Sequence, residues 1–104
     1  MVTIDFLFFA DCPSHDVALK RLQTILAEEQ ITADIRITEV TSDAQAQELK
    51  FVGSPTIRIN SIDIDPPPID DLYGLSCRAY HTADGRITPL PQPELIRTAL
   101  RKLP

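Results

Sequence analysis

The sequence has no long hydrophobic run: the longest, residues 6–10, is far shorter than the ~20 residues of a membrane span. No basic segment precedes an apolar one at the amino terminus, so we expect no secretory signal and a cytoplasmic protein. Basic residues are also few: ten Lys and Arg stand against fifteen Asp and Glu, a net charge of −5. Because a phosphate backbone attracts basic proteins, we do not expect nucleic acid as a partner. The short hydrophobic runs likewise lead us to expect no membrane partner.

Cysteine is equally scarce, with Cys12 and Cys77 alone among 104 residues. The two are too few for a disulfide scaffold and too far apart for a local zinc knuckle. The sequence also contains no Gly-rich phosphate loop and no Ser-His-Asp series. We therefore expect no cofactor and no metal. The length and the 43% of hydrophobic residues suit a single domain over residues 1–104.

The hydrophobic pattern of the first half predicts a strand, a helix and a second strand. Residues 2–9 are apolar almost throughout, as in a strand buried in the middle of a sheet. Residues 14–29 form an amphipathic pattern whose inward positions are Val17, Ala18, Leu22, Ile25 and Leu26. Residues 31–40 alternate, which indicates a half-buried strand and completes a βαβ unit.

In the second half, turn signals carry more information. Ser42 and Gln45 form a capping box for a short helix, and Gly53 either ends that helix or allows the following turn. A reversal at residues 60–61 predicts a hairpin that brings four isoleucines onto one face: Ile57, Ile59, Ile62 and Ile64. Residues 66–75 are expected to be irregular, 76–82 to form a strand before an Asp84-Gly85 turn, and Pro93 to open a last helix.

The sharpest chemical feature is Asp-Cys-Pro-Ser-His at residues 11–15, between the first strand and the first helix. At a helix start, unpaired N–H groups and the positive end of the dipole favour the nucleophilic thiolate of Cys12. His15, when protonated, adds positive charge, whereas Asp11 and Asp16 act in the opposite direction. The alternative is that Cys12 is a small buried residue without chemistry.

A second feature is Gly-Ser-Pro-Thr at residues 53–56, which is compatible with a cis bond before Pro55. Together the two motifs resemble the thioredoxin superfamily over almost the whole chain. The resemblance implies a thioredoxin-like α/β fold: a central mixed sheet of 4–5 strands with helices on both faces. It further implies a cis-proline beside a nucleophilic Cys12, with substrate-binding residues Pro13, Ser54, Pro55 and Thr56.

The sequence departs from the dithiol members of that family at two places. His15 stands where they have their second cysteine. Asp5 resembles the aspartate that thioredoxins bury in the strand before the cysteine, but it lies seven positions before Cys12 rather than six. Cys77 is the candidate replacement, because the predicted hairpin returns the proline-rich loop toward Cys12. The alternative is that Cys77, which alternates with Ala79 and His81, is one more buried side chain. For Arg78, next to Cys77, three roles are open: to stabilise a thiolate, to hold an anion or to form a surface ion pair.

Three functions are compatible with these residues. The first is a thiol–disulfide oxidoreductase with Cys12 as nucleophile, Cys77 or glutathione as resolving thiol and His15 assisting; its partner would be a protein or small-molecule disulfide. The second is a non-catalytic module that holds an extended peptide beside Pro55. The third is a soft-metal or organomercurial thiol protein, because residues 73–78 and the front motif also resemble small thioredoxin-like proteins labelled alkylmercury-lyase-like.

Overall fold

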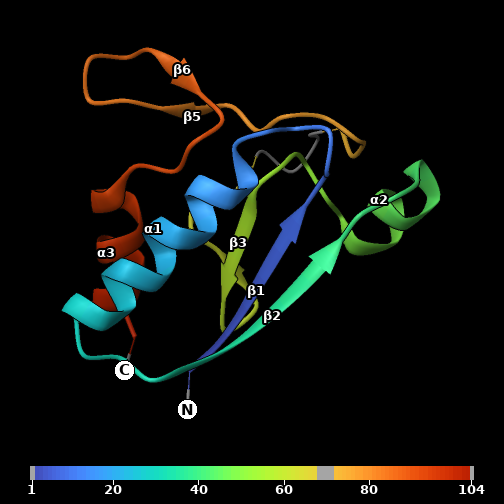
Figure 1. Ribbon diagram of the computed structural model, residues 1–104. Helices are drawn as coiled ribbons and strands as arrows, with labels where there is room; N and C mark the ends of the chain where they lie inside the picture. The colour runs from blue at the N-terminus through green and yellow to red at the C-terminus, as the bar shows by residue number, and fades with distance from the viewer. Residues whose placement is uncertain (1, 68–71, 104) are drawn as a thin grey trace.

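A computed structural model describes residues 2–67 and 72–103 of the chain as three helices and six strands (Figure 1). In chain order these are β1 (Val2–Phe8), α1 (His15–Glu28), β2 (Ala33–Glu39), α2 (Asp43–Leu49), β3 (Thr56–Ile59), β4 (Ile62–Asp63), β5 (Tyr80–His81), β6 (Ile87–Thr88) and α3 (Pro93–Arg101).

The first four strands form one mixed sheet in the order β2-β1-β3-β4. β1 runs parallel to β2 and antiparallel to β3, so the apolar first strand occupies the interior of the sheet, as predicted. β5 and β6 form a separate small hairpin beyond the carboxyl end of β1 (Figure 1). The mixed α/β class and the four-stranded central sheet are thus confirmed.

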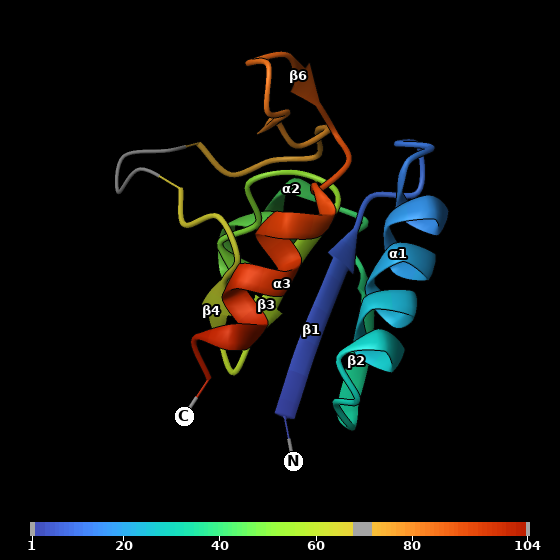
Figure 2. The ribbon, with the colours of Figure 1, turned by 90° about the vertical axis from the view of Figure 1, so that its left-hand side faces the viewer.

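Helices pack on both faces of this sheet. α1 and α3 lie next to one another on one face (Figure 2), where Phe6 and Ile57 meet Leu22 and Ile96 in the main core. Leu7 points to the opposite face because side chains alternate along a strand. There it packs in a smaller cluster with Val40, Ala46 of α2 and Phe51.

The turns before and after α2 set the direction of the chain toward β3. The Gln45 N–H donates to Ser42 Oγ at 3.1 Å, which confirms the predicted cap. The helix ends at Lys50 in the left-handed conformation (φ 56°), so Gly53 is not its C-cap. Gly53 instead adopts φ 144° in the turn before Pro55.

The predicted hairpin is confirmed, with Asn60 and Ser61 both at positive φ (49° and 71°), as a type I′ turn requires. Ile59 is opposite Ile62, and the Ile64 N–H donates to the Ile57 carbonyl. The isoleucines at 57, 59 and 64 are buried, but Ile62 is 68% exposed. The register therefore confirms the predicted isoleucine face, which is exposed at Ile62 beside the hairpin tip.

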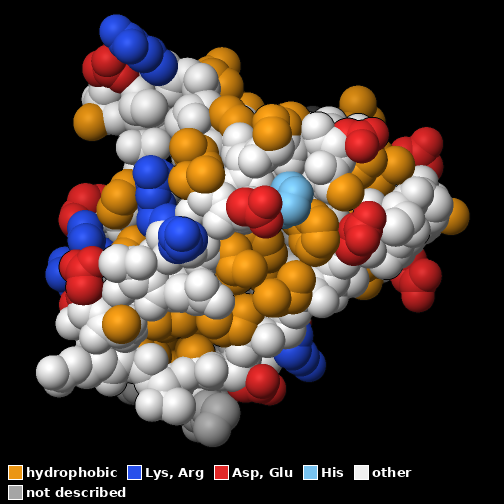
Figure 3. All heavy atoms as spheres, in the orientation of Figure 1, with side chains coloured by type: hydrophobic (Ala, Val, Ile, Leu, Met, Phe, Trp, Pro, Cys, Tyr) orange, Lys and Arg blue, Asp and Glu red, His pale blue; other side chains and the backbone are white. Residues whose placement is uncertain are grey.

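The structure corrects two details. Val17 of α1 is 51% exposed rather than buried. Hydrophobic side chains gather beside α1 on the molecular face that Figure 3 shows. The strand expected over residues 76–82 is reduced to one bridge at Cys77 and the two residues of β5. The turn at residues 84–85 does follow, and residues 68–71 of the predicted irregular segment lie outside the described residues.

Candidate functional site

Cys12 lies in the turn that joins β1 to α1. Its N–H donates to the Phe9 carbonyl at 3.0 Å, and the helix begins at His15, with Ser14 as N-cap. The residue is 1% exposed. The turn thus places the Cys12 thiol inside the protein, close to the amino-terminal end of α1.

The cis peptide bond expected between Ser54 and Pro55 is present. The Ser54 carbonyl oxygen lies 3.6 Å from Cys12 Sγ, so the proline turn and the cysteine turn meet. Ser54, Pro55 and Thr56, which were expected to bind substrate, are all buried. The hydroxyl of Thr56 donates to the Gly53 carbonyl at 2.6 Å and closes the turn.

The structure brings Cys77 to Cys12, and the two form a disulfide with a Cα–Cα distance of 5.8 Å across 65 positions of sequence. This Cα separation lies within the ordinary range for a disulfide. The β3–β4 hairpin returns the chain to this end of the sheet, as the sequence argument required. The bond therefore joins the start of α1 to the segment that follows the proline-rich loop.

The backbone around Cys77 pairs directly with the cis-proline turn. The Ser54 N–H donates to the Ser76 carbonyl, and the Arg78 N–H donates to the Ser54 carbonyl, each at 2.8 Å. These two bonds form a parallel bridge between Ser54 and Cys77. The backbone beside Pro55, which the resemblance reserves for an extended peptide, is thus already occupied by residues 76–78 of the same chain.

Gly53 makes this close approach possible. A Cβ atom at that position would lie 2.9 Å from both the Cα and the N of Arg78. In addition, residues other than glycine rarely adopt a backbone φ of 144°. Sequence reasoning placed the glycine either at the end of the helix or in the turn that follows, and the structure shows it in the turn. Its second reason, contact with a segment 25 positions away, depends on the tertiary fold.

Arg78 fixes the segment on the side away from the solvent. Its guanidinium donates to both carboxylate oxygens of Asp63, at 2.8 and 3.0 Å, and to the Asp65 carbonyl. The side chains of Arg78 and Asp63 are only 6% and 10% exposed. The predicted surface ion pair is therefore wrong in one respect: the pair exists but is buried, because Arg78 points inward from its strand-like segment.

Tyr80 completes this anchor. Its hydroxyl donates to the Pro55 carbonyl at 2.7 Å, and the guanidinium of Arg78 lies 4.9 Å from the centre of its ring. Burial raises the pKa of Tyr80 above its ordinary value, although the positive charge of Arg78 opposes the increase. We call Asp63, Arg78 and Tyr80 the anchor; sequence reasoning missed Asp63 and Tyr80.

The alternation along the segment places Cys77 on the opposite side from the anchor. Cys77, Ala79 and His81 are exposed, whereas Arg78 and Tyr80 are buried. The interpretation of Cys77 as one more buried side chain is therefore wrong. A hollow of about 370 Å³ opens beside Cys77, and its walls are Val52, Asp65, Pro66, Pro67, Arg78, Ala79 and His81.

Among the described residues, no hydrogen bond or ion pair joins the other predicted site residues to either sulfur. The ring of His15 stacks on Phe8, and its Nδ1 lies 3.3 Å from a carboxylate oxygen of Asp16. Pro13 is exposed. Asp5, compared above with the buried aspartate of thioredoxins, pairs instead with Arg36 at 2.9 Å.

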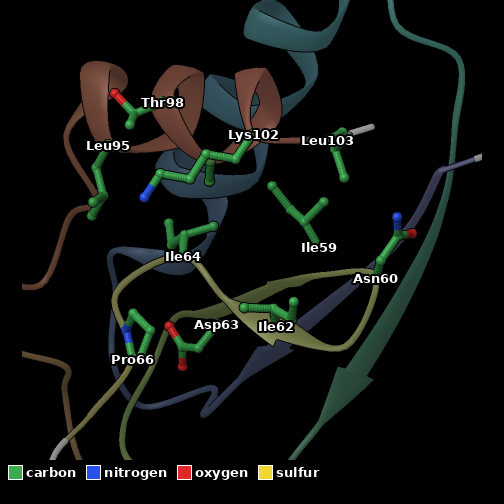
Figure 4. A pocket seen from close by; sticks show the side chains of 11 residues that line it. Ile59, Asn60, Ile62, Asp63, Ile64, Pro66, Leu95, Thr98, Lys102 and Leu103 are labelled. Atoms are coloured by element: carbon green, nitrogen blue, oxygen red, sulfur yellow. The ribbon is translucent and has the colours of Figure 1, made fainter.

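A second hollow, of about 350 Å³, lies between α3 and the β3–β4 hairpin. Figure 4 shows Ile59, Ile64 and Leu103 on its walls, with Lys102 extending from α3 above Ile64. Asp63 of the anchor also lines this hollow, and its carboxylate pairs with Arg78. Its lining contains no cysteine.

No protein-family model, no curated protein and no solved structure matches the chain. Within residues 2–67 and 72–103, no three His, Cys, Asp or Glu side chains are grouped as metal ligands would be. In the same part of the chain, no helix has the length and apolar character needed to cross a membrane. Any assignment of function therefore depends on the chemistry of the site itself.

Proposed function

We propose that this chain is a cytoplasmic, thioredoxin-like thiol–disulfide oxidoreductase in which Cys12 and Cys77 form the redox pair. The observation that carries the proposal is their disulfide beside the turn that contains Ser54 and Pro55. Paired cysteines in the reducing cytoplasm are usually transient and catalytic rather than structural.

The reaction is thiol–disulfide exchange. In the reduced protein, one thiolate attacks a sulfur of a substrate disulfide, forms a mixed disulfide and releases the first substrate thiol. The second thiolate then attacks the protein sulfur of the mixed disulfide, which closes the Cys12–Cys77 bond and releases the second substrate thiol. Two electrons pass from the protein dithiol to the substrate, and glutathione can regenerate the dithiol by the reverse sequence.

The alternative of a peptide-binding groove beside Pro55 has less support. Such a groove needs free backbone groups, but the N–H and the carbonyl of Ser54 already bond to residues 76 and 78. A peptide could pair there only after this segment had left. The soft-metal alternative depends on the same two thiols and stays a prediction.

The test is equilibration of the folded protein with mixtures of reduced and oxidised glutathione, followed by thiol trapping with a maleimide and intact mass measurement. We expect one reversible two-electron transition, with circular dichroism unchanged. Cys12→Ser and Cys77→Ser should each abolish the internal disulfide.

A purely structural disulfide gives a different result. Closing a loop of 65 residues stabilises a folded chain by up to about 4 kcal/mol in the chain-entropy model. If the bond is reduced only when denaturant unfolds the protein, its role is this stabilisation and the oxidoreductase proposal fails.

A further inference from the structure

We infer that the external thiol or disulfide reacts at Cys77, and that Cys12 is the internal partner that never meets the substrate. This inference rests on the proposed function and specifies its substrate. The substrate sulfur would belong to a cysteine flanked by peptide groups on both sides, for which glutathione is the smallest probe.

The first argument is access to the two sulfurs. Exchange requires the attacking thiolate to reach one sulfur atom of the disulfide. Cys12 is 1% exposed and lies between its own turn and the turn at Ser54. Cys77 is exposed and borders the hollow beside residues 65–67. An external thiolate therefore meets Cys77 first.

The second argument is the state of the backbone at Cys77. Its segment uses one edge to pair with Ser54, through the carbonyl of Ser76 and the N–H of Arg78. In an extended segment, the N–H and carbonyl of Cys77 itself point to the other edge. Within the described part of the chain, neither group has a hydrogen-bond partner.

An open strand edge pairs with another extended segment through backbone hydrogen bonds. A cysteine with a peptide group on either side has the N–H and carbonyl that such pairing needs, and glutathione has both. A thiol without amide groups, such as 2-mercaptoethanol, has neither. The open edge at Cys77 therefore favours cysteinyl peptides over simple thiols.

The steps balance as follows. The substrate thiolate attacks Cys77 Sγ; the Cys12–Cys77 bond breaks, and Cys12 leaves with the electron pair as a thiolate. A second substrate thiolate attacks the substrate sulfur of the mixed disulfide and releases the Cys77 thiolate. Two substrate thiols are oxidised to one disulfide, the protein disulfide is reduced to two thiols, and the protons move through solvent.

The first arm of the test locates the mixed disulfide. Oxidised wild-type protein is mixed with glutathione, quenched with acid within the first turnover and mapped by peptide mass spectrometry. We expect glutathione on Cys77; glutathione on Cys12 would overturn the inference.

The second arm compares single variants with oxidised glutathione. Cys12→Ser, which retains Cys77, should be modified about tenfold faster or more than Cys77→Ser, because a buried sulfur reacts only after local opening. Both should react alike in denaturant. If Cys77→Ser reacts as fast as Cys12→Ser in the native state, the assignment is wrong. This comparison does not need a working redox cycle, so it separates failure of the inference from failure of the proposed function.

The third arm tests the peptide edge. The rates of glutathione, a cysteinyl peptide blocked at both ends and 2-mercaptoethanol with the oxidised protein are each divided by the rate of that thiol with a small model disulfide. The two amide-bearing thiols should exceed 2-mercaptoethanol by about tenfold, and equal ratios would refute pairing at the edge. Glutathione alone being faster identifies a small-molecule substrate, whereas the blocked peptide being faster identifies a protein.

Discussion

The buried ion pair between Arg78 and Asp63 provides the strongest prediction about stability. In Asp63→Ala, the guanidinium of Arg78 keeps the Asp65 carbonyl and the ring of Tyr80 but loses both carboxylate bonds. Removing one partner of a buried pair leaves an uncompensated charge and costs about 3–5 kcal/mol. The side chains are 6% and 10% exposed, so solvent does little to reduce that cost.

The assay is unfolding of the oxidised protein by urea and by heat, followed by circular dichroism. A loss of about 3 kcal/mol lowers the Tm of a domain of this size by roughly 12 °C or more. Asp84→Ala is the matched control, because Asp84 also pairs with an arginine, Arg86, but on the surface. The urea and thermal unfolding midpoints of Asp84→Ala should differ little from those of the wild type.

A double variant isolates the cause. Replacing both partners by apolar residues of similar size, Asp63→Leu with Arg78→Met, removes the unpaired charge, and should therefore cost less than Asp63→Ala alone. The reasoning would be refuted if Asp63→Ala lost less than about 1 kcal/mol, or if the double variant were the less stable of the two.

Three further substitutions test the neighbourhood of the disulfide. Gly53→Ala should cost more than about 2 kcal/mol, because its Cβ would meet the Arg78 backbone at 2.9 Å, whereas Gly85→Ala, with no atom within 4 Å, carries only the cost of positive φ. Ser54→Ala should leave urea stability unchanged or raise it, because the buried Ser54 hydroxyl has no hydrogen-bond partner among the described residues; a loss above about 1 kcal/mol would contradict this. Tyr80→Phe should cost about 1 kcal/mol for the bond to Pro55. Burial raises the pKa of Tyr80 above the unfolded value of about 10, so its neutral form stabilises the fold below that pH and this stabilisation is lost as the pH rises further. Tyr80→Phe should therefore remove the decrease in the free energy of unfolding above about pH 10. If this decrease is the same in the variant as in the wild type, Tyr80 is not its cause.

The features that the sequence predicts well are those decided by neighbouring residues. The Ser42–Gln45 cap and the reversal at residues 60–61 each depend on a few adjacent side chains and backbone conformations. The hairpin then implied the approach of Cys77 to Cys12, because it fixes where the chain returns. The cis bond at Pro55 came from the family resemblance, since the local sequence alone favours trans.

The features that the sequence did not predict depend on what covers a residue. Periodicity assigns Val17 and Ile62 to an apolar face but does not say whether another element reaches that face, and both are exposed. Arg78 follows the reverse pattern: a charged residue is expected at the surface. It is buried because Asp63, 15 positions away, supplies a carboxylate that neutralises it.

The anchor affects the proposed redox pair through the fraction of reduced molecules in which Cys77 stays close to Cys12. Asp63, Arg78 and Tyr80 hold the segment of Cys77 by contacts that do not involve either sulfur, so we expect these contacts to persist when the disulfide is reduced. The equilibrium constant for closing the disulfide is scaled by the fraction of reduced molecules in which Cys77 is held opposite Cys12. In Asp63→Ala that fraction falls, while the covalent bond still tethers the oxidised form. If the reduced segment is held in only one molecule in about ten, the equilibrium with glutathione shifts about tenfold toward the dithiol. Asp84→Ala should leave this equilibrium where it is in the wild type. An Asp63→Ala protein that is less stable but has the wild-type glutathione equilibrium would mean that the turn at Pro55 alone holds Cys77, and that the anchor serves stability without tuning the thiol pair.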